Sequence, residues 1–314
     1  MDQASLRRHR AANLRQTRWL ASGMALLLAY IGWLLGGWPV ALAGLVAVVL
    51  SYYFSQPLSA QILLRMHRAQ PVSERQAPPL YRALKTLSER AGIPTPQLYI
   101  YPHPSPNAFA TGSSQSASIA LSEGLLNRLQ WEAIVGVIGH EISHIRNDDL
   151  RLMGFADLAS RITGLFSLAG LLLLMVSLPM IILTNLQVPW LLVILLILAP
   201  QISILLQMAL SRTREFEADR GSAELIGSAE PLIKALRRID PPQLSLFQRL
   251  VFRRHMPAEP SHVRSHPPTA ERIARLEQLS MRQRRWSPLQ VIGNLRNSPD
   301  LYQLLPDGPP RRHY

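Results

Sequence analysis

The segment VIGHEISHIRND, from Val137 to Asp148, contains two histidines four residues apart, with a glutamate directly after the first. On an α-helix, residues i and i+4 lie on the same face, so His140 and His144 would direct both imidazoles toward one point. A catalytic zinc site takes three protein ligands, often including histidine nitrogens, and keeps one position open for water. Glu141 would lie close enough to that water to take its proton. The spacing is therefore that of an H-E-x-x-H zinc hydrolase motif.

An alternative interpretation is that the two histidines lie on a solvated helix face without a metal. The residues around them are apolar on nearly every side of the expected helix, which indicates burial: Ile134, Val135, Val137, Ile138, Ile142 and Ile145. Buried histidines need polar partners, and this favours a metal site. The sequence contains no cysteine, so histidine and carboxylate must supply the ligands.

The third ligand is expected from the segment SRTREFEADRGSAEL, which begins at Ser211. Glu215 and Asp219 are again four residues apart, and Glu215 could complete the metal site. Asp219 could accept the outer N–H of a ligating histidine, as carboxylates around metal sites commonly do. The alternative is a charged helix at the membrane surface, and for Glu217 a solvated position is the preferred interpretation.

Two long uncharged runs predict a membrane protein. No Asp, Glu, Lys or Arg occurs from Trp19 to Leu64 or from Ile162 to Ser211. A bilayer-spanning helix needs about 20 predominantly apolar residues, so each run fits two spans joined by a turn. Four spans are therefore predicted, at Trp19–Leu35, Trp38–Phe54, Ile162–Leu183 and Trp190–Leu210.

Arginines flank these runs and predict the orientation of the chain. They occur in the N-terminal tail, after the second span and after the fourth, whereas the turns between spans carry no charge. By the positive-inside rule, both termini and the central segment face the cytoplasm. The net charge of +13 is thus explained by contact with anionic lipid, and no nucleic-acid partner is expected.

The resulting organisation alternates membrane hairpins with soluble segments. A basic tail (1–18) precedes a hairpin (19–54), a catalytic segment (57–161), a second hairpin (162–210), a second catalytic segment (211–295) and a polar tail (296–314). Helices are expected at Pro79–Ala91, Ser122–Leu129 and Trp131–Arg146, and short strands at Gln97–Tyr101 and Ser118–Leu121. The segment 240–260 is basic and amphipathic, and it either lies on the membrane surface or packs on the catalytic domain.

HEISHIRND, two apolar spans and then SRTREFEAD resemble the HtpX-like membrane zinc metalloproteases, which are relatives of the CaaX prenyl endoproteases. The resemblance extends to NAFATG (Asn107–Gly112), to SIALSEGLL, to Asn147 and Asp149, and to SHPPTAERI (Ser265–Ile273). These blocks occur in family order and cover roughly residues 15–280. The implied fold is mainly α, with a small β-sheet, four transmembrane helices and a zincin-like cytoplasmic metalloprotease domain assembled from two segments.

The resemblance also implies roles for individual residues. Zinc would be bound by His140, His144 and Glu215, with Glu141 as catalytic base and Asp219 supporting a zinc-binding histidine. Asn107, Ala108 and Phe109 match an edge segment that holds the substrate peptide as an added strand. His266 matches a residue that steadies the oxyanion, and Arg272, in the same block, is a possible site residue.

The resemblance further implies cleavage of misfolded or damaged proteins in the bacterial cytoplasmic membrane. Two other functions are compatible with the sequence. One is a CaaX-type enzyme that trims prenylated peptides, for which more spans are expected. The other is a membrane adaptor with a zinc-stabilised but inactive fold, which would have no need of Glu141. The sequence does not determine the oligomeric state, and cobalt or manganese also fit a His/His/Glu site.

Overall fold

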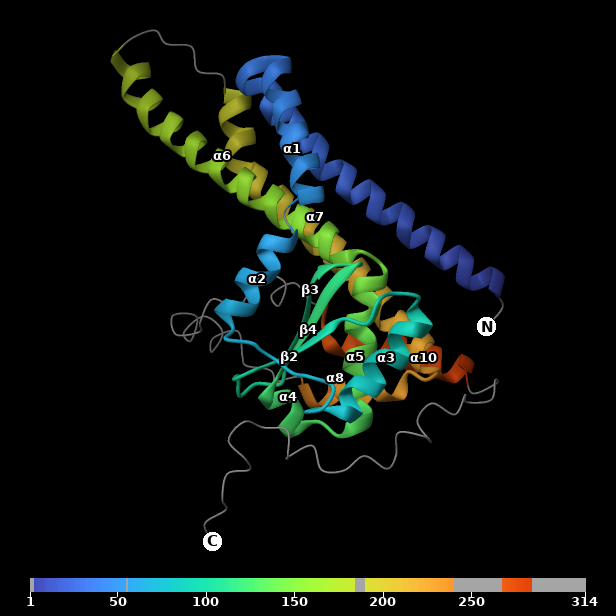
Figure 1. The fold of residues 1–314 in the computed structure, drawn as a ribbon. Coiled ribbons are helices and arrows are strands. Elements are labelled where there is room, and N and C mark those ends of the chain that lie inside the picture. The colour runs from blue at the N-terminus through green and yellow to red at the C-terminus, as the bar shows by residue number, and fades with distance from the viewer. Residues whose placement is uncertain (1–2, 55, 184–189, 240–266, 284–314) are drawn as a thin grey trace.

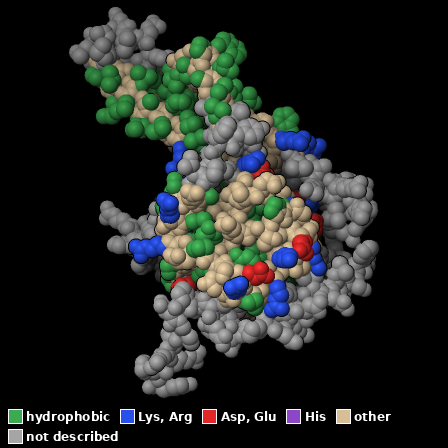
Figure 2. Space-filling view, in the orientation of Figure 1, with side chains coloured by type: hydrophobic (Ala, Val, Ile, Leu, Met, Phe, Trp, Pro, Cys, Tyr) green, Lys and Arg blue, Asp and Glu red, His purple; other side chains and the backbone are tan. Residues whose placement is uncertain are grey.

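The computed structural model describes residues 3–54, 56–183, 190–239 and 267–283. Long helices project from a smaller domain that contains the β-sheet (Figure 1). Hydrophobic side chains cover the projecting helices, and Lys and Arg side chains lie near their junction with the domain (Figure 2). His266 and the segments 240–260 and 296–314 lie outside the described residues.

The first predicted hairpin lies within one helical element, α1 (Gln3–Phe54). The chain reverses at Gly36 and Gly37, where the backbone leaves helical geometry (Figure 1). Gly37 has φ of 69°, a value that side-chain-bearing residues rarely adopt. The predicted spans Trp19–Leu35 and Trp38–Phe54 thus correspond to the two arms of α1.

Length and hydropathy identify three candidate membrane spans among the described helices: Arg15–Val46, Asp149–Pro179 and Trp190–Ile226. The structure thus offers three candidate spans where the sequence predicted four. The two numbers differ at α1, because both of its predicted spans lie in one helical element and yield a single candidate. All three candidate helices lie largely in the uncharged runs and are long and apolar enough to cross a membrane.

The second predicted hairpin corresponds to α6 (Asp149–Leu183) and α7 (Trp190–Ile226), which pack side by side. Both helices extend beyond the predicted spans on the side of the domain. Polar contacts join them, because the Ser160 hydroxyl donates to Gln207 Oε1 at 2.8 Å and lies 3.1 Å from the Ser203 hydroxyl. Beyond the predicted span end at Leu210, α7 continues without a break through the segment that carries Glu215.

The sheet has four strands in the order β1-β2-β4-β3. They are β1 (Gln70–Pro71), β2 (Gln97–Tyr101), β3 (Ala108–Ser113) and β4 (Ser116–Ser122). β2 pairs parallel with β4, and β3 pairs antiparallel with β4. β2 matches its predicted bounds, β4 is longer than predicted, and β3 forms an edge of the sheet, as the resemblance implied for NAFATG.

Within the described residues, five shorter helices surround this sheet: α3 (Pro78–Ala91), α4 (Glu123–Arg128), α5 (Trp131–Arg146), α8 (Glu230–Ile239) and α10 (Thr269–Gln283). A further helix, α2 (Gln56–Met66), connects the domain to α1. α3 ends at Gly92 (φ 68°), and the Ser122 hydroxyl caps α4 by accepting from Leu125 N–H at 3.0 Å. Leu84, Ile119 and Ile138 are fully buried in the core between α3, β4 and α5.

Helices α5 and α7 cross at very close range, and a small residue is required there. A Cβ atom at Gly221 of α7 would lie 1.9 Å from the Ser143 hydroxyl oxygen and 2.9 Å from Ser143 Cβ of α5. Ser143 is fully buried, so it has no open space into which it could move. This contact brings the two helices that carry the predicted metal ligands together.

Substitution Gly221→Ala is expected to lower the free energy of unfolding by about 1–3 kcal/mol, because overpacking forces shifts in a close-packed interior. Thermal unfolding of the purified protein in detergent measures the effect. Gly154→Ala in α6 is the matched control, since its Cβ would meet nothing within 4 Å. The control should be neutral or mildly stabilising, because alanine favours helix over glycine. Equal unfolding temperatures for the two variants would contradict the close approach.

Candidate metal centre

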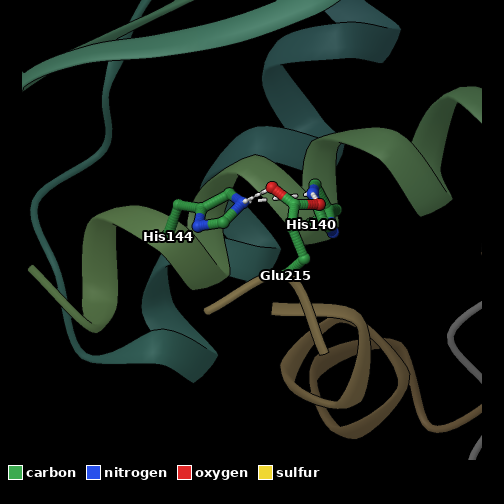
Figure 3. Close-up of side chains that lie close together, drawn as sticks. All are labelled: His140, His144 and Glu215. Carbon is green, nitrogen blue, oxygen red and sulfur yellow. Dashed lines mark hydrogen bonds and ion pairs between the residues drawn. The ribbon is translucent and has the colours of Figure 1, made fainter. Parts of the chain in front are cut away.

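α5 places His140 and His144 on one face, and α7 brings Glu215 against both (Figure 3). The two imidazole Nε2 atoms lie 3.1 Å apart. Each lies 3.6 Å from a different carboxylate oxygen of Glu215. The three candidate ligand atoms all lie within 4.8 Å of one another. The predicted assembly of these residues into one potential metal site is therefore present in the structure.

The partners of the two Nδ1 atoms indicate that the Nε2 atoms are the ones available to a metal. Nδ1 of His140 lies 3.1 Å from Asp219, and Nδ1 of His144 lies 2.8 Å from Asp149. Carboxylates only accept hydrogen bonds, so a neutral His144 holds its proton on Nδ1 and keeps the Nε2 lone pair for a metal. The contact of Asp219 with Nδ1 favours the same tautomer of a neutral His140. Two imidazole lone pairs and the carboxylate of Glu215 thus point at one another. Such a donor set repels itself unless a proton or a metal cation lies between its members, and its ligand types fit Zn²⁺.

Asp149 is a further residue of the centre whose contacts the sequence did not reveal. It is the first residue of α6, is 1% exposed, and forms an ion pair with the buried Arg214 of α7 as well as its contact to His144. Asp148, with φ of 57°, forms the tight turn between α5 and α6 that returns Asp149 toward His144. In the sequence, the resemblance to the family at Asp149 was the signal that pointed to this residue. Its partner Arg214 lies 65 residues away, so local spacing could not predict their contact.

Arg272 of α10 joins the same centre from the C-terminal side. Its guanidinium donates to both carboxylate oxygens of Asp219, at 2.8 Å and 2.6 Å, and its Nη1 lies 3.2 Å from Glu215. Burial alone would lower the pKa of Arg272, but Asp219, Glu215 and Glu141 raise it above its ordinary value. The sequence identified Arg272 only as a possible site residue, and the structure places it in contact with Glu215 and Asp219.

The charges around the centre suit a divalent cation. Burial would lower the pKa of His144, but the hydrogen bond to Asp149 and the neighbouring Glu215 raise it well above its usual value. Four buried carboxylates and two buried arginines leave an excess of two negative charges when the histidines are neutral: Glu141, Asp149, Glu215 and Asp219 with Arg214 and Arg272. Buried charges require compensation, and a divalent cation supplies it.

The predicted substrate segment lies along the outer strand of the sheet. Asn107 N–H donates to the Ser122 hydroxyl at 2.8 Å, and its carbonyl accepts from Ser122 N–H at 2.9 Å. Because antiparallel residues alternate in direction, the backbone groups of Ala108 and Ala110 face away from β4. The Phe109 ring packs against the Tyr101 ring of β2, with ring centroids 5.5 Å apart.

Residues 74–280 match the family model described as peptidase family M48, which spans most of the chain. The chain belongs to peptidase family M48. This M48 peptidase is 37% identical over 258 residues to a protease HtpX homolog of Paenarthrobacter aurescens (strain TC1), covering 78% of this chain and 86% of the relative. It is 34% identical to a protease HtpX homolog of Streptococcus gordonii over 322 residues, 86% of this chain and 98% of the relative.

A solved structure also aligns with this M48 peptidase. It is a crystal structure of S. mikatae Ste24p, with a TM-score of 0.47 and 18% sequence identity, covering 86% of this chain and 67% of that one. The family match, together with the three candidate membrane helices, identifies the chain as an HtpX-like membrane metalloprotease.

In this M48 peptidase, Asp149→Asn is expected to weaken zinc affinity about 10–100-fold, because His144 loses the charge that orients its ring and raises its basicity. Competition with a chelator measures the affinity. Asp148→Asn is the matched control, because Asp148 lies 3.4 Å from Arg151 and asparagine tolerates its positive φ. If Asp149→Asn bound zinc as tightly as that control, His144 would not depend on the Asp149 charge.

Proposed function

We propose that this M48 peptidase is a membrane-embedded, zinc-dependent endopeptidase that hydrolyses peptide bonds of misfolded or damaged membrane proteins on the cytoplasmic side. The observation that carries this proposal is the convergence of His140, His144 and Glu215 into one self-repelling donor set beside the buried Glu141. A purely structural metal site has no use for the additional carboxylate of Glu141, which favours an enzyme over an adaptor.

The chemistry follows from the roles of the chain's own side chains. A zinc ion bound by the three ligands would supply Lewis acidity, which acidifies water and polarises a carbonyl group. Glu141 takes the proton of the attacking water and passes it to the leaving amine. Asp219 and Asp149 hold the two histidines in the ligating tautomer, and Arg272 fixes the carboxylates of Asp219 and Glu215. His266 is proposed to stabilise the oxyanion.

The substrate peptide is proposed to bind as an added strand along β3. Ala108 and Ala110 present backbone N–H and C=O groups at the edge of the sheet, and such groups bind extended peptides with little regard to sequence. The backbone groups of Asn107 and Phe109 face β4, so these two residues hold β3 in the sheet and do not pair with the peptide backbone. This arrangement supports broad specificity of the kind that quality control of unfolded proteins requires.

The proposed topology places both termini and the active site in the cytoplasm, with four spans in the bacterial cytoplasmic membrane. It is supported by Arg18 and Arg212 next to the uncharged runs and by the reversal in α1. The proposed catalytic domain combines the segments 57–161 and 211–295, because α5 contributes ligands before the second uncharged run and the end of α7 contributes one after it. Reporter fusions at the turns and termini test the span count, and additional spans would favour a CaaX-type enzyme.

Cleavage of an unfolded model protein by the purified chain in detergent tests the enzymatic proposal. Activity is expected to disappear when a chelator removes the metal and to return when about one equivalent of zinc is added. Metal content is measured in the same samples. A protein that holds zinc tightly yet cleaves neither unfolded nor membrane-derived polypeptides would support the adaptor function instead.

A further inference from the structure

Helix α2 occupies a distinctive position between the membrane helices and the sheet. It begins at Gln56, two residues after the end of α1, and in the view of Figure 1 it runs across the direction of α6 and α7. Its Leu64, 9% exposed, packs with Tyr101 and Ala120 on the outer side of the sheet. One face of α2 is thus attached to the catalytic domain.

The opposite face of α2 is apolar and exposed. Ile62 is 56% exposed and Met66 is 68% exposed. Both lie about 160° around the helix from Leu64, so they point away from the domain. Exposed large apolar side chains that follow a helical face directly after a membrane span are typical of a helix lying in the membrane interface.

The charged residues around this face of α2 are all positive. Arg65 and Arg68 are exposed, and no Asp or Glu occurs anywhere between Gln3 and Ser73. Arg65 directly follows the first uncharged run, as the exposed Arg212 directly follows the second, so both arginines mark the level of the membrane surface. Clustered arginines at that level attract anionic lipid headgroups.

We propose that α2 docks on the cytoplasmic leaflet as an interfacial helix, with Ile62 and Met66 at the acyl boundary and Arg65 and Arg68 on the phosphates of anionic phospholipids. The docked helix also supports the edge of the sheet, because the His67 ring after α2 lies 5.1 Å from the Phe109 ring of β3. Docking therefore holds β3 at a set height above the bilayer. The cytoplasmic side of the docking and its consequence for the substrate rest on the proposed function, whereas contact of α2 with the bilayer does not.

The absence of cysteine allows a direct test. Ile62→Cys and Met66→Cys are each labelled with a polarity-sensitive dye, and the protein is reconstituted in nanodiscs of phosphatidylcholine with or without phosphatidylglycerol. Lys85→Cys, on the exposed face of α3, is the control. We expect a blue-shifted emission and strong quenching by brominated lipid at positions 62 and 66, but not at 85. Phosphatidylglycerol should increase the quenching several-fold, and Arg65→Gln/Arg68→Gln should abolish this increase.

Each outcome decides the proposal without reference to proteolysis. If the dyes at positions 62 and 66 are as water-exposed as the dye at position 85, α2 does not dock on the bilayer. If they are shielded in detergent at high protein concentration and exposed on dilution, a second copy of the chain covers the face and the proposal is wrong. Shielding that is equal in both lipid mixtures overturns the anionic-lipid part. Zinc content of each variant confirms that the substitutions leave the fold intact.

Discussion

Replacing Glu141 with glutamine is expected to reduce proteolysis by about 10²–10⁴-fold, the usual contribution of a general base. Glutamine keeps the size and hydrogen-bonding capacity of the side chain but cannot accept the proton. Glu141 lies between the two histidines on α5, is buried, and is not one of the three converging ligands. Zinc content should therefore stay unchanged, and kcat rather than KM should carry the loss. Initial rates on an unfolded protein, measured beside metal analysis, separate the two effects.

Glu132→Gln on the same helix is the matched control. Glu132 forms an ion pair with Lys234 at 2.7 Å, far from the histidines at the other end of α5. This variant should retain full activity. If Glu141→Gln retained wild-type rates with its metal bound, Glu141 would not be the base, and the proposed mechanism would fail. If it lost zinc, its effect would concern the metal site and not the proton transfer.

Replacing Glu215 with glutamine is expected to remove the metal itself. The carboxylate faces both Nε2 atoms, and without its charge the site loses one ligand and one of the charges that compensate the cation. The affinity for zinc should fall by more than the roughly 10–100-fold that loss of an outer carboxylate causes. Proteolysis should fall in parallel. Chelator competition and activity at increasing zinc concentration measure both quantities.

Glu217→Gln is an unusually close control for this experiment. Glu215 and Glu217 lie two residues apart on α7 and are both 5% exposed. Because Glu217 is buried, the prediction that it would be solvated is wrong. It pairs with Arg220 at 2.6 Å and is not one of the three converging ligands. Zinc affinity should stay unchanged in this variant. Equal losses in both variants would indicate damage to α7 and not the removal of a ligand.

Local patterns in the sequence were sufficient wherever one short segment decides the outcome. The spacing of His140 and His144 and the apolar residues around them determine a buried helix with two imidazoles on one face, and α5 has its predicted bounds. The uncharged runs determine the membrane helices, because a bilayer admits few charges. Gly92 determines the end of α3 through its positive φ. Each of these outcomes depends on residues within a few turns of one another.

Only the tertiary structure decided how the metal centre is held together. Asp149 bonds to His144 across a tight turn and pairs with Arg214, 65 residues away, while Arg272 reaches Asp219 across 53 residues. Such contacts leave no periodic trace in the sequence, because their partners come from different helices. The strand β3 likewise alternates Phe109 and Thr111, which favour strands, with Ala, Gly and Ser, which do not, and its pairing with β4 holds it in the sheet. The sequence therefore specified the chemical groups, and helix packing determined their mutual orientation.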